Sequence, residues 1–231
     1  NGAGFTIYGG IGSSMSYVDF VLDIVYYIEE KILRWRVKMK VLLLNGSPNV
    51  NGNTARALEE MRKIFEEENI ETEVLQIGSQ EIRGCCACQS CYKTAKCIFD
   101  DMVNEVAKKF EECDGMVVGS PVYYASANGT LTAFLDRLFY STRFDKRMKV
   151  GASIAVARRG GCSATFDQLN KYFTISGMPL ASSQYWNSVH GAKPGQAEQD
   201  LEAMQTMRTL AHNMSFLMKS IELGKEKFGL P

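Results

Sequence analysis

Apolar runs and amphipathic segments alternate along most of the chain, which is the pattern of strands that are each followed by a helix. Residues 41–44 are apolar without alternation, as in a strand buried on both faces, and they predict a strand at 41–45. Residues 54–69 then place apolar side chains at helical spacing. Similar pairs recur toward the C-terminus. They predict strands at 73–77, 115–119, 150–157 and 179–186, a helix that begins near residue 100, and further helices at 129–141, 163–175 and 196–223. This alternation predicts an α/β fold, a doubly wound five-stranded parallel sheet with helices on both faces.

Residues 1–38 differ from the rest of the chain. Apolar positions at helical spacing predict an amphipathic helix from about residue 16 to residue 37. Met39 and Lys40 follow, and the apolar run of the first predicted strand begins directly after them. We therefore expect an N-terminal helical extension, residues 1–38, and an α/β domain, residues 39–231.

Composition argues against several classes of function. The 231 residues carry 26 Lys and Arg against 26 Asp and Glu, so there is no surplus positive charge to hold a nucleic acid. The most apolar run, residues 18–28, is interrupted by Asp19 and Asp23, which argues against a membrane span. Basic residues follow this run instead of preceding it, which is the reverse of a secretory signal. We expect a cytoplasmic protein that binds neither nucleic acid nor membranes.

The segment that joins the first strand to the first helix predicts an anion site. Residues 45–54 are rich in Gly, Asn, Ser and Thr, so successive backbone N–H groups can turn toward one point in front of a helix N-terminus. A phosphate suits this site, with further hydrogen bonds from Ser47, Asn49, Asn53 and Thr54. The segment has no Lys, which disfavours a nucleoside triphosphatase and favours a bound phosphate monoester. The alternative is a polar turn that only caps the helix at Asn53.

The loop after the third predicted strand indicates a shelf for a flat ring. Tyr123 and Tyr124 lie among small residues, and nearby backbone N–H groups can reach the polar edge of a heteroaromatic ligand. Either tyrosine could instead be a core aromatic whose hydroxyl is hydrogen-bonded. The residues expected to contact the ring are Ser120, Pro121, Val122, Tyr123, Tyr124, Asn128 and Gly129.

Five of the seven cysteines lie between residues 85 and 97. Four of them form a C-x2-C-x2-C-x5-C pattern, a spacing that can present thiolates to a 4Fe–4S cluster. A zinc site needs the same four ligands, and free structural or redox-active thiols are a further alternative. The expected ligands are Cys85, Cys88, Cys91 and Cys97, with Cys86 as the additional thiol.

Two further loops carry candidate catalytic residues. Arg158 and Arg159 follow the fourth predicted strand, where a guanidinium can pair with a phosphate or with the negative charge of a reduced cofactor. His190 follows the last predicted strand, where a substrate pocket is expected.

Two motifs together resemble a known family. The first is G-S-P-x-x-x-G-N-T at 46–54, and the second is G-S-P-V-Y at 119–123 with L-D-R at 135–137. Over residues 39–223 the chain resembles the NADPH-dependent FMN reductases of the flavodoxin-like superfamily, and its cysteine spacing resembles the iron-sulfur flavoproteins. The resemblance implies a flavodoxin-like fold, FMN with its phosphate in the 46–54 loop and its ring against the 120–130 loop, and a homodimer or homotetramer. It also favours iron over zinc at the cysteines.

We therefore expect an FMN-dependent NAD(P)H oxidoreductase. It would pass electrons from a nicotinamide nucleotide through FMN to a quinone, another small molecule, O₂ or an iron-sulfur acceptor. The main alternative is an iron-sulfur flavoprotein that only carries electrons to a protein partner, although the zero net charge is unlike that of an acidic carrier. A scaffold without flavin is the third possibility.

Overall fold

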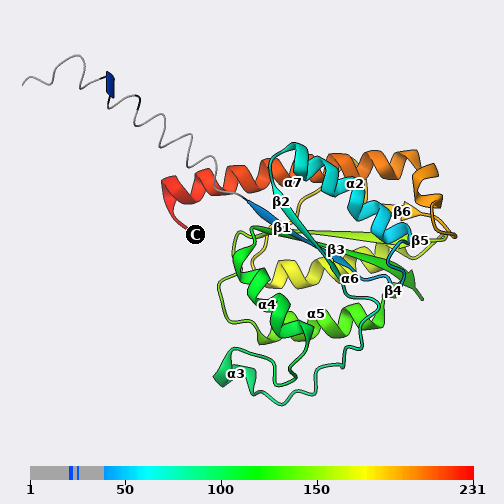
Figure 1. Cartoon of the computed structure of the whole chain (residues 1–231), viewed down its shortest axis with the longest axis horizontal. Helices are drawn as coiled ribbons and strands as arrows, with labels where there is room; N and C mark the ends of the chain where they lie inside the picture. The colour runs from blue at the N-terminus through cyan, green and yellow to red at the C-terminus, as the bar shows by residue number, and fades with distance from the viewer. Residues whose placement is uncertain (1–20, 23–24, 26–38) are drawn as a thin grey trace, which may run out of the picture. The chain divides into compact units, whose positions relative to one another are not determined.

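The computed structural model describes residues 21–22, 25 and 39–231. The helix predicted at 16–37 lies mostly outside the described residues, and the division of the chain after residue 38 stays a prediction. Residues 39–231 are drawn in full in Figure 1.

The centre of the fold is a parallel sheet. Among the described residues, five parallel strands lie in the order β2-β1-β3-β5-β6, and a short sixth strand, β4, pairs antiparallel with β3. This is the flavodoxin-type order, and it confirms the predicted doubly wound sheet. The bounds are β1 Lys40–Asn45, β2 Glu71–Gln76, β3 Gly115–Tyr123, β4 Ser126–Ala127, β5 Val150–Ala157 and β6 Ser188–His190.

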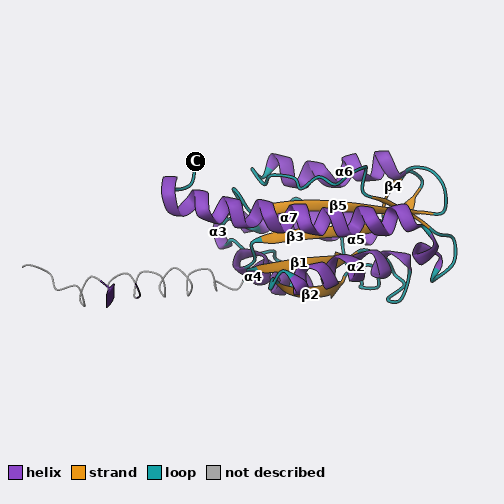
Figure 2. Ribbon diagram, turned by 90° about the horizontal axis from the view of Figure 1, so that it is seen from above, coloured by secondary structure: helices purple, strands orange, loops and turns teal. Residues whose placement is uncertain are grey.

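Helices cover both faces of the sheet (Figures 1 and 2). On one face α2 and α7 pack against Val41 and Leu43, and on the other α4, α5 and α6 pack against Leu42 and Leu44. Successive side chains of a strand point to opposite faces, so the unbroken apolar run of β1 contributes to both cores. The long helices are α2 Asn53–Glu67, α4 Met102–Glu112, α5 Gly129–Ser141, α6 Cys162–Ile175 and α7 Leu201–Phe228, and the short ones are α3 Cys91–Thr94 and the 3₁₀ helix η1 Gln196–Gln199.

The strand predicted at 179–186 is wrong in its position. Leu180 makes only an isolated bridge to β5, and the regular edge strand is β6, at 188–190. Two side chains explain the gap. Ser183 donates its hydroxyl proton to a carbonyl of α7, and the amide of Asn187 donates to the Ser153 carbonyl of β5 at 3.0 Å. The Asn187 side chain therefore takes the β5 carbonyl that the backbone of a regular edge strand would use, and Ser183 ties the segment to a helix instead of a strand.

Two other boundaries differ from the prediction. The helix predicted at 196–223 is divided at Asp200, whose carboxylate accepts a hydrogen bond from the Ala203 N–H and caps α7. The third strand continues to Tyr123 instead of ending at Gly119, because it turns directly into the hairpin with β4.

The strand order reverses between β1 and β3, so the loops that follow these two strands meet at one edge of the sheet. The Gly46 N–H donates to the Gly119 carbonyl at 2.8 Å, which joins the two loops. In doubly wound sheets this is the place where ligands bind. In the described part of the chain no helix is long and apolar enough to cross a bilayer.

Candidate functional site

The β1–α2 loop, residues 46–52, is held from behind by a chain of amide side chains. Asn45, at the end of β1, accepts a hydrogen bond from the Ser47 N–H at 3.0 Å and donates to Gln76 at 2.7 Å. Gln76, at the end of β2, in turn donates to the Ser47 carbonyl at 2.6 Å. Asn45 is buried, so this network is shielded from water and fixes the path of the loop.

The loop also passes very close to a neighbouring segment. A Cβ atom added at Gly78 would lie 2.2 Å from the Gly46 carbonyl oxygen and 2.3 Å from the Ser47 carbonyl carbon. These are backbone atoms, so they have little freedom to move away. Only glycine at position 78 allows this approach.

The N-terminus of α2 is open. Gly52 is the N-cap and provides no side-chain cap, so the cap predicted at Asn53 lies one residue earlier. The backbone N–H groups of Asn53, Thr54 and Ala55 make no hydrogen bond with the described residues. Three unpaired N–H groups at the positive end of a 15-residue helix form an anion site.

The polar side chains predicted to bind phosphate differ in whether their hydrogen-bonding groups are already paired within the protein. Asn53 accepts from the Ala197 N–H at 3.1 Å and donates to the Lys193 carbonyl at 3.0 Å, so it ties α2 to the loop after β6. Asn49 accepts from the Asn51 N–H. The Ser47 hydroxyl accepts from the Asn49 N–H at 3.1 Å and keeps its own proton available, and the Thr54 hydroxyl has no partner among the described residues.

The loop after β3 is a tight hairpin that presents its aromatic residues outward. Tyr124 and Ala125 have φ angles of 52° and 58°, the left-handed conformation of a two-residue hairpin turn. Tyr123 is 46% exposed and Tyr124 is fully exposed, so neither is a core aromatic. The left-handed conformation is unfavourable for tyrosine, and it turns this ring out to the edge of the sheet.

The predicted polar residues around the hairpin support it from inside. Ser120 is fully buried, donates to the Pro121 carbonyl and accepts from the Asn128 N–H. Asn128 caps α5 by accepting from the Thr130 N–H at 2.7 Å. Because both side chains are satisfied within the protein, they shape the shelf, and the groups left to contact a ligand are on Pro121, Val122, the two tyrosines and Gly129.

One open recess lies beside the hairpin and a second lies beside the loop after β6, and Arg158 and Arg159 line both. The first, of about 390 Å³, includes Val122 and Tyr124, and the second, of about 370 Å³, includes His190. Both arginines are exposed, and neither makes a hydrogen bond or ion pair with another described residue. Two unpaired guanidiniums at the edge of a recess are suited to binding an anionic ligand.

His190 is held by Asp200. The Asp200 carboxylate accepts from the His190 backbone N–H at 2.9 Å and lies 3.3 Å from its Nδ1 atom. The other ring nitrogen, Nε2, lies 3.9 Å from the sulfur of Cys162, the first residue of α6. Burial raises the pKa of the Cys162 thiol, so this thiol stays protonated near neutral pH.

The cysteine loop, residues 85–97, lies apart from these loops and has little regular structure. Cys85, Cys86 and Cys88 are exposed, Cys91 is buried and Cys97 is half-buried. Left-handed residues separate the cysteines: Ala87 and Gln89 flank Cys88, and Ala95 lies between Cys91 and Cys97. Hydrogen bonds from the backbone and hydroxyl of Ser90 lower the pKa of Cys88.

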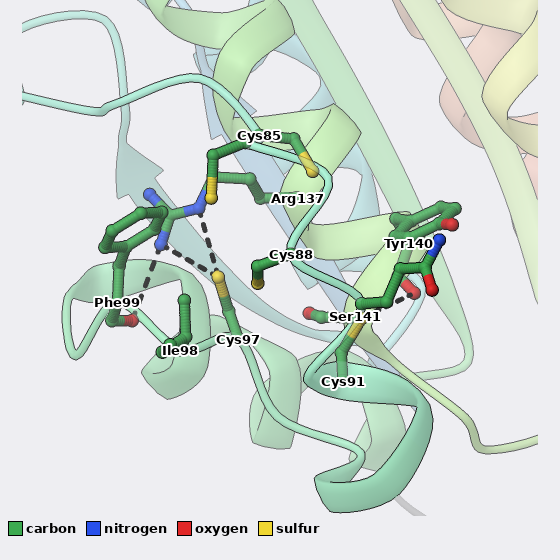
Figure 3. A pocket seen from close by; sticks show the side chains of 11 residues that line it. Cys85, Cys88, Cys91, Cys97, Ile98, Phe99, Arg137, Tyr140 and Ser141 are labelled. Carbon is green, nitrogen blue, oxygen red and sulfur yellow. Dashed lines mark hydrogen bonds between the residues drawn. The ribbon is translucent and has the colours of Figure 1, made fainter.

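All five cysteines of this loop line one small pocket (Figure 3). Its volume is about 20 Å³, the space of a single water molecule. Within the described residues, no group of three or more His, Cys, Asp or Glu side chains is placed to hold a metal ion. Four thiols around one pocket are the type of ligands that a 4Fe–4S cluster needs. The exposed part of the loop has to close before their sulfur atoms are at the right distances to bind it.

Two residues with no predicted role hold the buried end of the cysteine loop. Asn104 of α4 accepts from the Cys97 N–H at 2.9 Å and donates to the carbonyls of Cys97 and Phe99. Arg137 of α5 donates to the Cys97 sulfur from two of its nitrogens, each at 3.3 Å. A sequence signal exists for Arg137, because it is a charged residue three positions from Phe134 on the otherwise apolar side of its helix.

The chain is similar to known proteins over most of its length. The model of the NADPH-dependent FMN reductase family matches residues 39–193. An iron-sulfur flavoprotein of Methanocaldococcus jannaschii is 33% identical over 192 residues, which cover 80% of this chain and 100% of that protein.

Two solved structures share the fold. RosB with bound 8-demethyl-8-formylriboflavin-5'-phosphate has a TM-score of 0.65 and 16% identity, and the match covers 83% of this chain and 81% of RosB. A flavodoxin from the domain Archaea has a TM-score of 0.54 and 16% identity, and the match covers 78% of this chain and 99% of the flavodoxin.

Proposed function

The chain belongs to the NADPH-dependent FMN reductase family, which consists of flavoprotein oxidoreductases, and we propose that it binds FMN at the carboxyl edge of its sheet. A reduced nicotinamide nucleotide is the proposed electron donor. When bound, FMN supplies the hydride and electron chemistry, and the protein supplies binding, orientation and charge.

The observation that carries this proposal is the open N-terminus of α2. Three unpaired N–H groups and the Thr54 hydroxyl lie at this helix end, and the Ser47 hydroxyl lies in the preceding loop, which Asn45 and Gln76 hold in place. A phosphate monoester gains both hydrogen bonds and the favourable potential of the helix end. The absence of a lysine matches a permanently bound phosphate more closely than one that is transferred.

The hairpin after β3 is the proposed support for the flavin ring. Tyr123 and Tyr124 offer exposed aromatic surface, and the Gly129 N–H begins α5 directly behind the shelf. Arg158 and Arg159 are proposed to bind phosphate groups of the nicotinamide nucleotide or to stabilise negative charge on the reduced ring. His190 lies in the same recess as these arginines and is the proposed contact for the substrate.

The cysteine loop is the proposed acceptor of single electrons. Four thiols, Cys85, Cys88, Cys91 and Cys97, are proposed to bind a 4Fe–4S cluster, and the M. jannaschii relative is named as an iron-sulfur flavoprotein. The left-handed residues between them let consecutive cysteines turn toward one centre. Assembly as a homodimer or homotetramer and a cytoplasmic location stay predictions.

The test begins with cofactor binding. The purified chain is expected to bind one FMN and to bind riboflavin, which lacks the phosphate, far more weakly, as measured by fluorescence quenching of the free flavin. Equal affinity for the two flavins would overturn the phosphate site. Anaerobic addition of NADPH or NADH is then expected to bleach the flavin absorbance, and iron and acid-labile sulfide analysis decides whether the cysteines hold a cluster.

A second candidate is an electron carrier that exchanges electrons only with protein partners. The exposed side of the cysteine loop favours this possibility, because a cluster held there would lie near the surface. A carrier of this kind keeps its flavin oxidised in the presence of NADPH or NADH alone and is reduced only when a donor protein is added. Bleaching by the nucleotide alone excludes it.

A further inference from the structure

Arg137 is an unusual residue for the centre of a protein. It lies on α5, its side chain is 1% exposed, and it is the largest of the fully buried side chains. A buried guanidinium has lost its water, so it is tolerated only where anions and hydrogen-bond acceptors replace that water. The acceptors around it therefore indicate what it is there to bind.

Every nitrogen of the Arg137 guanidinium has a partner. Nε and Nη2 each donate to the Cys97 sulfur at 3.3 Å, and Figure 3 shows these two bonds converging on the sulfur. Nη1 and Nη2 pair with the Asp101 carboxylate at 2.7 and 2.9 Å. Nη1 also donates to the Arg83 carbonyl, and the cation lies over the Phe99 ring.

The guanidinium thus bridges one carboxylate and one cysteine sulfur. Asp101 is the N-cap of α4, and Asn104, on the same helix, holds the backbone of Cys97. The position of the sulfur relative to the cation is therefore fixed from two helices. A structural cation would need only the carboxylate, but here two of its N–H groups are directed to sulfur.

We propose that Arg137 is a positioning residue for the iron-sulfur cluster. Its guanidinium binds the sulfur of the ligand Cys97 and raises the reduction potential of the cluster. This rests on the proposed binding of a cluster by the cysteine loop. Reduction adds negative charge to the cluster and its thiolates. Hydrogen bonds to ligand sulfurs and a nearby positive charge stabilise that added charge, and both come from the same guanidinium.

The proposal predicts shifts of opposite sign for two neighbouring substitutions. Arg137→Gln removes the cation and shortens the donor, so the midpoint potential falls. Asp101→Asn leaves the guanidinium in place without its compensating anion, so the potential rises, and asparagine is itself a good N-cap. Arg83→Gln is the matched control, because its exposed cation lies over the same Phe99 ring and its side chain makes no hydrogen bond to a sulfur within the described part of the chain.

The experiment is an anaerobic redox titration of the iron-loaded full chain, followed by electron paramagnetic resonance. For Arg137→Gln we expect the equilibrium constant for reduction of the cluster to fall at least tenfold, which lowers the midpoint potential by about 59 mV for a one-electron couple. Asp101→Asn is expected to move it upward, and Arg83→Gln to leave it nearly unchanged because water screens an exposed charge. Iron content and flavin absorbance are measured for each variant.

The possible outcomes separate this proposal from the function on which it rests. If the wild-type chain binds no iron, the cluster and the role of Arg137 both fail, whereas the result for FMN binding is independent. If the wild-type chain is loaded but Arg137→Gln leaves the potential unchanged, or both variants move it the same way, only the role of Arg137 is overturned. If Arg137→Gln does not fold, the Asp101→Asn shift decides: upward supports the proposal, and no change or a fall overturns it.

Discussion

The β1–α2 loop and the cysteine loop are both proposed to hold a cofactor, yet they are built in opposite ways. The β1–α2 loop is short, and buried amides hold its backbone at the edge of the sheet. The cysteine loop is held near Cys97 by residues of α4 and α5 and at α3 by Tyr140 of α5, while Cys85 to Cys88 are exposed. The comparison indicates that the anion site is formed in advance, whereas the cluster site is completed by its ligand.

The largest effect on cofactor binding is expected from a negative charge in the β1–α2 loop. Ser47→Asp keeps an acceptor for the Asn49 N–H but places a carboxylate beside the proposed phosphate. Repulsion between like charges is expected to weaken FMN binding at least a hundredfold, about 2.8 kcal/mol. Ser47→Ala, the uncharged control, loses one hydrogen bond and should cost about 1 kcal/mol. A loss for Ser47→Asp no greater than that for Ser47→Ala would contradict an anion site here.

Substitution of two glycines, one beside each loop, tests whether the β1–α2 loop is held in place before the cofactor binds. Gly78→Ala forces a methyl group into the backbone of Gly46 and Ser47, and it should lower the free energy of unfolding by about 3 kcal/mol, the upper end of typical overpacking costs. Gly84→Ala, beside Cys85, meets no atom within 4 Å and should change stability little. Urea unfolding of both variants measures the difference, and equal stability of the two would show that the β1–α2 loop can shift.

Much of the fold could be predicted from the sequence, because it depends on local periodicity. Residues 41–44 are apolar at every position, and they form most of β1, an interior strand that is buried on both faces. The edge strand could not be placed in the same way. Its position depends on Ser183 and Asn187, whose side chains hydrogen-bond to α7 and β5 only once these elements are packed beside them.

The candidate site could be predicted only in part, for the same reason. The β1–α2 loop follows from its composition and its position between a buried strand and a helix. The partners of Asn53 are 140 and 144 residues away, and those of Arg137 are 36 to 54 residues away, so no local pattern indicates them. Arg137 is part of the recognised L-D-R motif, but its contact with Cys97 emerges only from the fold.

The fixed end of the cysteine loop is tested by removing Asn104. Asn104→Ala leaves the backbone N–H and carbonyl of Cys97 without their partner, and this should lower the free energy of unfolding by about 2 kcal/mol, within the range for buried groups that lose a hydrogen bond. Iron uptake should fall, while FMN binding is unchanged. Asn213→Ala, which removes an exposed amide from the Ser182 carbonyl, is the control. Weaker FMN binding in Asn104→Ala would show that the two loops are not independent.

The smallest effect is expected in an experiment that leaves the stability of the chain unchanged and compares the reactivity of its cysteine thiols. In iron-free protein at pH 8, iodoacetamide should modify the exposed Cys85, Cys86 and Cys88 first. Burial raises the pKa of Cys113 to about 12, so this thiol remains protonated at pH 8 and should stay unmodified until the chain unfolds. After iron loading, Cys85 and Cys88 should become protected while Cys86, the thiol outside the proposed ligand set, still reacts. Mass spectrometry of the digested protein identifies each site, and protection of Cys86 together with loss of protection at Cys85 or Cys88 would change the ligand assignment.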